Sequence, residues 1–487
     1  MRELTNKALN TAQSHGATYA DIRVVRRTTQ DLSIKNGLLQ SLTQDETYGF
    51  GVRVIADGAW GFASSSRVEP SEIDRVAALA VRIAKASASK NLRPLDLGPP
   101  EVHVDRYETP VEIDPLSVSL EEKIDLLLAA DREARSVKGV VVSTPAMHLL
   151  IEEKTFASSE GSFIEQRLVE SGVGMRATAV DEGEIQVRSY PNIFGIQQET
   201  GGYEVIKKWD LVGNAARIGE EAVALLSAPQ CPSKTTTLIL DGSQLGLQIH
   251  ESCGHPIELD RVFGDEAAFA GTSFLTPEKY GTFQYGSDIV NITSDAVMPG
   301  ALGTYGYDDE GVPAQTTPII ENGRFVGYLT SRESANQLRT IHPDAPERSN
   351  GAMRATGWNR IPIIRMNNVS LQPGEWTLDD LIADTDEGIY MITNKSWSID
   401  DRRVNFQFGT EMAYEIVNGK LGRLLKNPTY TGITPQFWGS CDAVCNAAHY
   451  TVWGTPYCGK GQPGQTAHVA HGTAPARFRN VQVGVMR

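Results

Sequence analysis

Hydrophobic and polar residues alternate along the first half of the chain in a way that predicts one series of elements twice. Residues 1–89 have the pattern of a helix, several strands and a second helix. Residues 116–228 repeat this plan, beginning at Ser119 and Glu122, which have the spacing of a capping box. The two closing helices have apolar positions at helical spacing: Ile73, Val76, Leu79, Ala80 and Ile83 after Pro70, and Leu211, Ala215, Ile218, Ala222 and Leu225.

A short motif supports this duplication. Residues 49–53 and 172–176 both read Gly-x-Gly-x-Arg, and an acidic residue followed by glycine comes a few positions later in each case. The glycines do not form a dinucleotide-binding motif, because no helix pattern follows them and the third glycine is missing. We expect them to permit bulges or close packing within strands.

The pattern changes from Thr235 onward. A strand rich in β-branched residues ends at Leu240, a turn follows at Asp241 and Gly242, and Ser243 is the expected cap of the next helix. Beyond this helix most of the pattern is that of strands. Asn-Gly pairs typical of tight hairpin turns occur at 322–323 and 418–419.

These patterns predict an α+β fold with three domains. The first two are duplicated units of helix, β-meander and helix, and the third is a mainly-β, barrel- or sandwich-like domain that carries the helix after Ser243. The expected boundaries are 1–106, 107–228 and 229–487.

The helix after Ser243 contains the sequence His-Glu-Ser-Cys-Gly-His at residues 250–255. Two imidazoles flanking a carboxylate suit a divalent metal that activates water. Helical zinc-protease motifs space the histidines four apart, whereas a spacing of five in a regular helix separates them by about 140°. Gly254 and Pro256 favour a local distortion, so we predict a π-type bulge or a helix end at Gly254.

The residues alone leave the roles around this motif open. Glu251 can be the general base for a metal-bound water, or an acceptor that orients an imidazole. Glu258 and Asp260 are candidates for a third ligand, because carboxylates often complete zinc sites.

The five cysteines offer further ligands. Cys231 lies in a proline-containing linker, and we expect Cys253 to be a packing residue. A separate structural zinc site is a weak alternative, because it would rest on one C-x-x-x-C pair; its ligands would be Cys441, Cys445, Cys458 and His449.

Several segments spanning nearly the whole chain resemble the TldD/PmbA family of zinc metalloproteases, on its TldD-like, metal-bearing side. The resemblance implies that His250, His255 and Cys458 hold Zn²⁺ and that Glu251 is the catalytic base. Such a ligand set leaves a fourth position for water. The matching segments, in consistent order, are residues 48–54, 250–255, 307–313, 321–323, 365–368 and 457–462.

We therefore expect a zinc-dependent peptidase that hydrolyses unfolded peptides or small flexible proteins. An extended substrate could add to an exposed strand edge. The resemblance also implies a homodimer, or a heterodimer with a related subunit. Two other functions remain open: a non-catalytic regulatory or scaffold subunit of a protease complex, and a metal-dependent amidase acting on non-peptide substrates.

Other polar residues have weaker signals. Tyr457, His468 and His471 could approach the metal, but such residues more often pack or lie at the surface, so we assign none of them. The acidic residues 308–310 could bind a second cation, and we expect a solvated turn instead.

The composition limits which binding partners and which cell compartment we expect. The chain has 487 residues with 45 Lys and Arg against 60 Asp and Glu, a net charge of −15 that argues against nucleic-acid binding. The polar start lacks a signal-peptide pattern, and no apolar run is long enough for a bilayer, so we expect no membrane partner. Five cysteines, an odd number, fit a reducing cytoplasm. The resemblance places that cytoplasm in a bacterium or archaeon.

Overall fold

The computed structural model describes residues 1–90, 95–265, 272–461 and 464–484. Residue 462, the last residue of the segment 457–462 that carries part of the family resemblance, lies outside the described residues. Within the described ranges, no helix is both long and apolar enough to cross a membrane.

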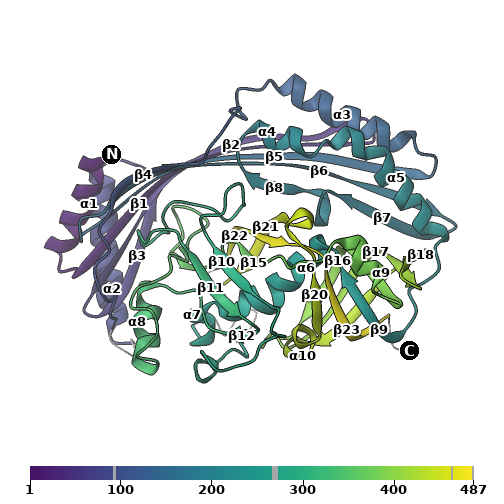
Figure 1. Cartoon of the computed structure of the whole chain (residues 1–487). Helices are drawn as coiled ribbons and strands as arrows, with labels where there is room; N and C mark the ends of the chain where they lie inside the picture. The colour runs from purple at the N-terminus through teal and green to yellow at the C-terminus, as the bar shows by residue number, and fades with distance from the viewer. Residues whose placement is uncertain (91–94, 266–271, 462–463, 485–487) are drawn as a thin grey trace.

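The first 228 residues build one eight-stranded sheet (Figure 1). Its order is β3-β2-β1-β5-β6-β4, and β7 and β8 also pair with β6. The two predicted units therefore share one sheet, joined where β1 and β5 run antiparallel. The strands are β1 (Tyr19–Lys35), β2 (Leu38–Ala56), β3 (Ala59–Ser65), β4 (Val104–Glu108), β5 (Val140–Ser158), β6 (Phe163–Asp181), β7 (Glu184–Tyr190) and β8 (Gln197–Thr200).

Each unit has the predicted order of helix, meander and helix. The first is α1-β1-β2-β3-α2 and the second is α3-β5-β6-β7-α5, with η1, β8 and α4 inserted before α5. Helix α5 buries all five of its predicted apolar residues, whereas Ile83 on α2 is exposed. The helices are α1 (Arg2–Ser14), α2 (Pro70–Ala88), α3 (Leu120–Ser136), η1 (Ile193–Gly195), α4 (Tyr203–Lys208) and α5 (Leu211–Ser227).

The repeated glycine motifs occupy β2 and β6, where they permit close packing as predicted. A Cβ at Gly51 would lie 2.4 Å from the carbonyl oxygen of Trp358. One at Gly174 would lie 2.3 Å from the carbonyl oxygen of Gly195. A larger residue at either position would push neighbouring backbone away from the sheet.

The C-terminal part contains a closed barrel of five strands, so the barrel prediction is confirmed. Strand β16 pairs with β9, and the pairing continues through β23, β19 and β17 back to β16. Strands β18 and β20 extend the same sheet. The bounds are β9 (Lys234–Leu240), β16 (Glu387–Ile399), β17 (Asn405–Val417), β18 (Lys420–Lys426), β19 (Thr429–Ile433), β20 (Cys441–Val444) and β23 (Ala476–Val483).

Smaller sheets and helices surround the barrel. One sheet has the order β12-β11-β10-β15, and β13–β14 and β21–β22 form separate pairs. The predicted turns at 322–323 and 418–419 join β11 to β12 and β17 to β18. The bounds are β10 (Ile292–Asp295), β11 (Thr316–Glu321), β12 (Arg324–Phe325), β13 (Met353–Arg354), β14 (Ile363–Ile364), β15 (Val369–Leu371), β21 (Thr451–Lys460), β22 (Gln465–Thr473), α7 (Leu259–Val262), η4 (Pro277–Lys279), α8 (Arg332–Ile341), α9 (Leu378–Ala383), α10 (Thr434–Gly439) and η5 (Ala447–His449).

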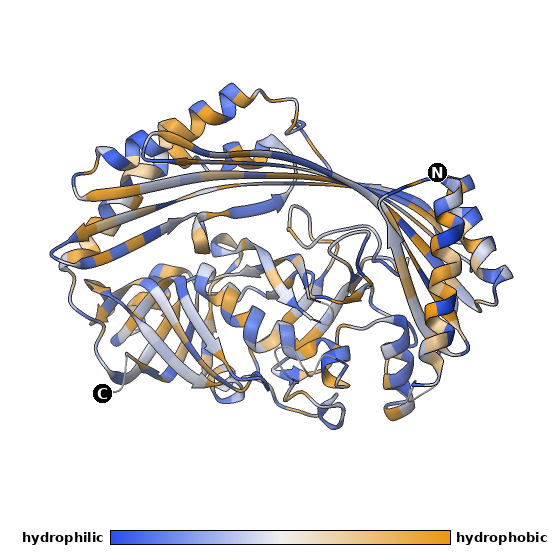
Figure 2. Cartoon of the chain, turned by 180° about the vertical axis from the view of Figure 1, so that it is seen from behind, coloured by the Kyte–Doolittle hydropathy of each residue, from blue (hydrophilic) through white to orange (hydrophobic). Residues whose placement is uncertain are grey.

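The long sheet arches over the C-terminal part (Figure 1). Helices α3, α4 and α5 lie on the outer side of the sheet, and α1 and α2 lie at the end of the sheet that is farther from α5. Hydrophobic and hydrophilic positions alternate along its long strands (Figure 2). This alternation is expected where a strand has one face on a hydrophobic core.

The acidic residues Asp308, Asp309 and Glu310 are buried where the sheet meets the C-terminal part, so the prediction of a solvated turn is wrong. Arg53 on β2 donates to Glu310 at 3.0 Å, and Lys154 on β5 donates to Asp309 at 2.7 Å. These ion pairs form because the fold brings cations from distant strands to the acidic residues. They bind the sheet to the C-terminal part.

Candidate metal centre

The helix that carries the histidine motif begins directly after barrel strand β9. Helix α6 spans Gly242–Ile249 and its N-cap is Asp241, whose carboxylate accepts a hydrogen bond from the backbone N–H of Ser243. The prediction that Ser243 caps the helix is therefore wrong. Asp241, two residues earlier, supplies the capping carboxylate.

The helix widens at the histidine motif. Residues His250–Gly254 (η2) form a π-helix, and His255–Ile257 (η3) form a short 3₁₀ turn. The backbone N–H of His255 donates to the carbonyl oxygen of His250, which is the five-residue bond of a π turn. The predicted distortion at Gly254 is confirmed, and it places both histidines on one side of the helix.

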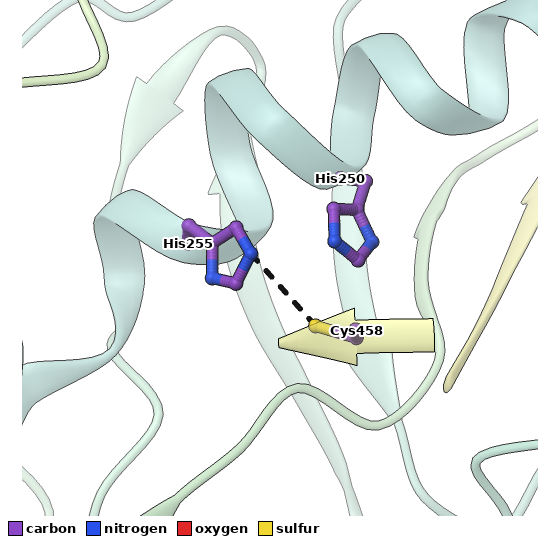
Figure 3. Close-up of side chains that lie close together, drawn as sticks. All are labelled: His250, His255 and Cys458. Carbon is purple, nitrogen blue, oxygen red and sulfur yellow. Dashed lines mark hydrogen bonds between the residues drawn. The ribbon is translucent and has the colours of Figure 1, made fainter. Parts of the chain in front are cut away.

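Cys458 faces the two histidines from strand β21 (Figure 3). Its Sγ lies 3.8 Å from Nε2 of His255, and the two imidazole centroids are 4.9 Å apart. One ligand atom from each of the three residues lies within 4.8 Å of the others, and all three side chains are buried. Cys458 lies on a strand, because residues 451–460 pair with β22.

The three side chains fit a zinc ion. Zinc binds imidazole nitrogen at about 2.0–2.1 Å and thiolate sulfur at about 2.3 Å, so tetrahedral nitrogen and sulfur ligands lie about 3.6 Å apart. The 3.8 Å between Sγ of Cys458 and Nε2 of His255 is close to that separation. Two imidazoles and one thiolate are also donors that zinc prefers.

The thiol of Cys458 differs from the other four. Burial raises its pKa, but the Arg365 guanidinium and His255 outweigh burial, so the pKa is lowered from its usual value. Nη2 of Arg365 lies 3.0 Å from Sγ of Cys458. Burial instead raises the pKa of Cys253 to about 12 and that of Cys231 to about 11. Cys458 is therefore the cysteine best suited to ligate as a thiolate.

Among the described residues, Cys441, Cys445, Cys458 and His449 do not gather into the alternative zinc site. Burial raises the pKa of the Cys441 and Cys445 thiols to about 12, which favours the neutral form. His449 instead accepts a hydrogen bond from the backbone N–H of Leu378. Within the described ranges, the one cluster of three residues spaced to hold a metal is His250, His255 and Cys458.

His471 sets the tautomer of His250. Nδ1 of His471 faces the carbonyl oxygen of Val369 at 2.7 Å, so this nitrogen carries the proton. Nε2 of His471 is then an acceptor, and Nδ1 of His250, 2.8 Å away, donates to it. Nε2 of His250 is left with a lone pair for a metal.

Glu258 orients His255 in the same way. Its carboxylate lies 2.9 Å from Nδ1 of His255, which leaves Nε2 of that ring facing Cys458. Asp260 accepts a hydrogen bond from Lys460 at 2.7 Å. Glu258 and Asp260, the two carboxylates considered as third ligands, are thus bound to other groups. Glu258 contacts Nδ1 of His255, whereas Nε2 of the same ring faces Cys458. Burial lowers the pKa of both His250 and His255, which favours the neutral imidazole that binds metal.

Glu251 forms an ion pair with Arg403, with 2.5 Å between the carboxylate and the guanidinium. Both side chains line a cavity of about 710 Å³ that His250 and His255 also line. Arg403 lies in the turn between β16 and β17 with a positive φ of 66°. This arrangement holds the Glu251 carboxylate beside the candidate ligands and in contact with the cavity.

The structure places the other three polar candidates, Tyr457, His468 and His471, in different surroundings. Tyr457 is 64% exposed and lines the cavity. His468 pairs with Glu170 and lines a different cavity, and His471 lies behind His250. Sequence reasoning assigned no role to Arg403 or Arg365. The run of charged residues at 400–403 could have drawn attention to Arg403, and Arg365 lies in a segment that carries the family resemblance.

Comparison with known proteins places the chain in a family. Its residues match PmbA/TldA metallopeptidase domain 1 at 20–84, the central domain at 113–228 and the C-terminal domain at 233–484. It is 32% identical to a metalloprotease of Methanocaldococcus jannaschii, over 93% of this chain and 94% of that protein. It is 24% identical to a zinc metalloprotease TldD homologue of Saccharolobus solfataricus, over 98% and 99%.

A solved structure from Thermotoga maritima has the same fold, with a TM-score of 0.77 and 19% identity, covering 99% of this chain and all of that one. The chain has the domain composition of a metallopeptidase. It belongs to the TldD/PmbA family, as the sequence motifs predicted.

Proposed function

We propose that the protein is a zinc-dependent peptidase with His250, His255 and Cys458 as metal ligands and Glu251 as the catalytic base. The observation that supports this most is the meeting of the three donors beside Glu251, where His250, Glu251 and His255 line a cavity. The zinc named for one relative agrees with this ligand set.

Each residue of the centre has a distinct part in this proposal. A zinc ion held by the three ligands would supply a Lewis acid that activates water and polarises the peptide carbonyl. Glu251 takes the proton of the attacking water and later gives it to the departing amine. Arg403 holds the Glu251 carboxylate in position by their ion pair. His471 and Glu258 hold the two imidazoles with Nε2 toward the metal position.

The cavity suits a peptide in extended conformation. Residues 455–457 and 459 of β21 line it, so a peptide lying there runs beside a strand. Main-chain hydrogen bonds along a strand supply affinity for unfolded segments of varied sequence, and pockets for single side chains add specificity. This supports unfolded peptides or small flexible proteins as the substrate class.

Zinc quantification and casein cleavage on four proteins test the proposal. Wild type should hold one zinc per chain and cleave casein, whereas Cys458→Ala should lose most of its zinc and its activity. Glu251→Gln should keep the zinc and lose activity by about 10²-fold or more. Cys231→Ser, in the linker before β9, is the control and should resemble wild type.

Three results would count against it. Wild-type protein with far less than one zinc per chain favours a scaffold subunit. Cleavage of small amides but not of peptides favours an amidase. Near wild-type cleavage by Glu251→Gln would remove Glu251 as the base.

A further inference from the structure

The cavity beside the candidate metal ligands has one apolar wall. Its apolar side chains are Ile193, Phe194, Ile196, Leu247, Trp397 and Ile399. Phe194 is 45% exposed and Trp397 is 41% exposed, which is unusual for rings of this size. Their centroids lie 6.0 Å apart with the planes tilted by 58°. Together they present a partly open aromatic surface to the cavity.

The two rings come from different parts of the fold. Phe194 lies in η1, within the central unit, and Trp397 lies on barrel strand β16. The aromatic surface therefore exists only where the sheet meets the barrel. His250, Glu251 and His255 line the same cavity, so this surface adjoins the candidate metal centre.

The backbone holds Phe194 in a costly conformation. Its φ of 62° and ψ of 7° are in the left-handed region, which is rare for a bulky residue. Asn192 anchors the turn by donating from Nδ2 to the carbonyl oxygen of Gly454 on β21 at 3.0 Å. The backbone N–H of Gly195 donates to the carbonyl oxygen of Asn192. Strain of this kind is concentrated at binding and catalytic positions.

We propose that Phe194 and Trp397 form a specificity subsite that takes a large apolar side chain, preferably aromatic, of the peptide residue next to the bond that is cut. The proposal rests on the peptidase function proposed above. A third ring inserted at this surface gains edge and face contacts with both aromatics and removes their exposed faces from water. Asp400 and Asp401, which also line the cavity, disfavour an acidic side chain there.

The test uses a set of otherwise identical peptides that carry Phe, Leu, Ala, Lys or Glu at one position, scanned along the peptide. Cleavage rates and equilibrium binding are measured with zinc-loaded wild type, Phe194→Ala, Trp397→Ala and the conservative Trp397→Phe. Leu421→Ala, which removes an exposed apolar side chain on β18, is the matched control. Binding to zinc-loaded Glu251→Gln gives a reading that does not depend on cleavage.

At one position, wild type should prefer Phe and Leu over Ala, Lys and Glu by about tenfold or more in kcat/KM. Phe194→Ala and Trp397→Ala should each remove most of this preference while changing the Ala peptide less than about twofold. Trp397→Phe should retain it, and Leu421→Ala should leave it unchanged.

Cleavage without any side-chain preference, or a preference that survives both alanine variants, would overturn the subsite while leaving the peptidase function intact. If no peptide is cut, the peptidase function fails, and the binding series then decides the subsite: equal binding of the Phe and Ala peptides rejects it. A uniform loss for all peptides in the alanine variants would mean a structural role instead.

Discussion

Nδ1 of His250 lies 2.8 Å from Nε2 of His471, a residue 221 positions further along the chain. This contact, and not the helix that carries the motif, determines which nitrogen of His250 is available to a metal. A residue on strand β22 thereby prepares a ligand on the π-helix.

His471→Leu should weaken zinc binding by about 10- to 100-fold, because His250 loses the acceptor that fixes its tautomer. Competition with a chromophoric chelator at fixed pH measures the change. His15→Gln, at the exposed C-cap of α1, serves as the control. An unchanged zinc affinity in His471→Leu would mean that the imidazole pair does not position the ligand.

Glu258→Gln should destabilise the fold by about 3–5 kcal/mol, because it removes a negative charge from a buried cluster of cations. Lys460 and Arg261 lie 3.6 and 3.5 Å from this carboxylate. Urea unfolding of the zinc-free protein measures the loss, with exposed Glu121→Gln on α3 as the reference. A midpoint equal to that of wild type would show that the buried charges are compensated without Glu258.

Gly254→Ala should destabilise the π-helix by about 1–3 kcal/mol, because an added Cβ would lie 2.0 Å from Sδ of Met366. Met366→Ala in the same chain should recover part of the loss, which a double-mutant cycle on the urea midpoints detects. Gly439→Ala in α10 is the control, since a Cβ there meets nothing within 4 Å. Additive effects of the two changes would contradict the proposed contact.

Asp309 should make the protein sensitive to acid. Burial raises the pKa of Asp309, but the Lys154 ammonium and the Arg23 guanidinium outweigh burial and lower the pKa to about 2. A depressed folded-state pKa gives stability that is present above the unfolded value near 4 and is lost as the pH falls toward 2.

The comparison with Asp309→Asn isolates this contribution. Wild type should exceed the variant in urea midpoint at pH 6, and the difference should shrink as the pH falls from 4 to 2. Exposed Asp45→Asn on β2 should match wild type throughout. A difference between wild type and Asp309→Asn that stays constant with pH would contradict the assignment.

The sequence predicts local features of this protein better than distant ones. The π turn was predictable because the spacing of His250 and His255 and the glycine between them are neighbours in the chain. The repeated units and the barrel follow from periodicity and turn residues in the same way. Cys458 lies 203 positions from His255, and only the family resemblance pointed to it.

The failures have the same physical origin. Residues 308–310 were predicted to be solvated because their cationic partners, among them Arg53 and Lys154, are far away in sequence. Arg403 had no assigned role, since a charged turn can attract attention but does not show which distant residue it meets, here Glu251. Contacts made by tertiary folding cannot be derived from the pattern of one segment.

Zinc K-edge X-ray absorption on the purified protein tests the central claim most directly. The account predicts one zinc per chain with one sulfur neighbour at about 2.3 Å and imidazole nitrogens at about 2.0–2.1 Å. The small amount of zinc that Cys458→Ala retains should have no sulfur neighbour. A zinc site without sulfur in wild type, or a protein that retains no zinc, would contradict it.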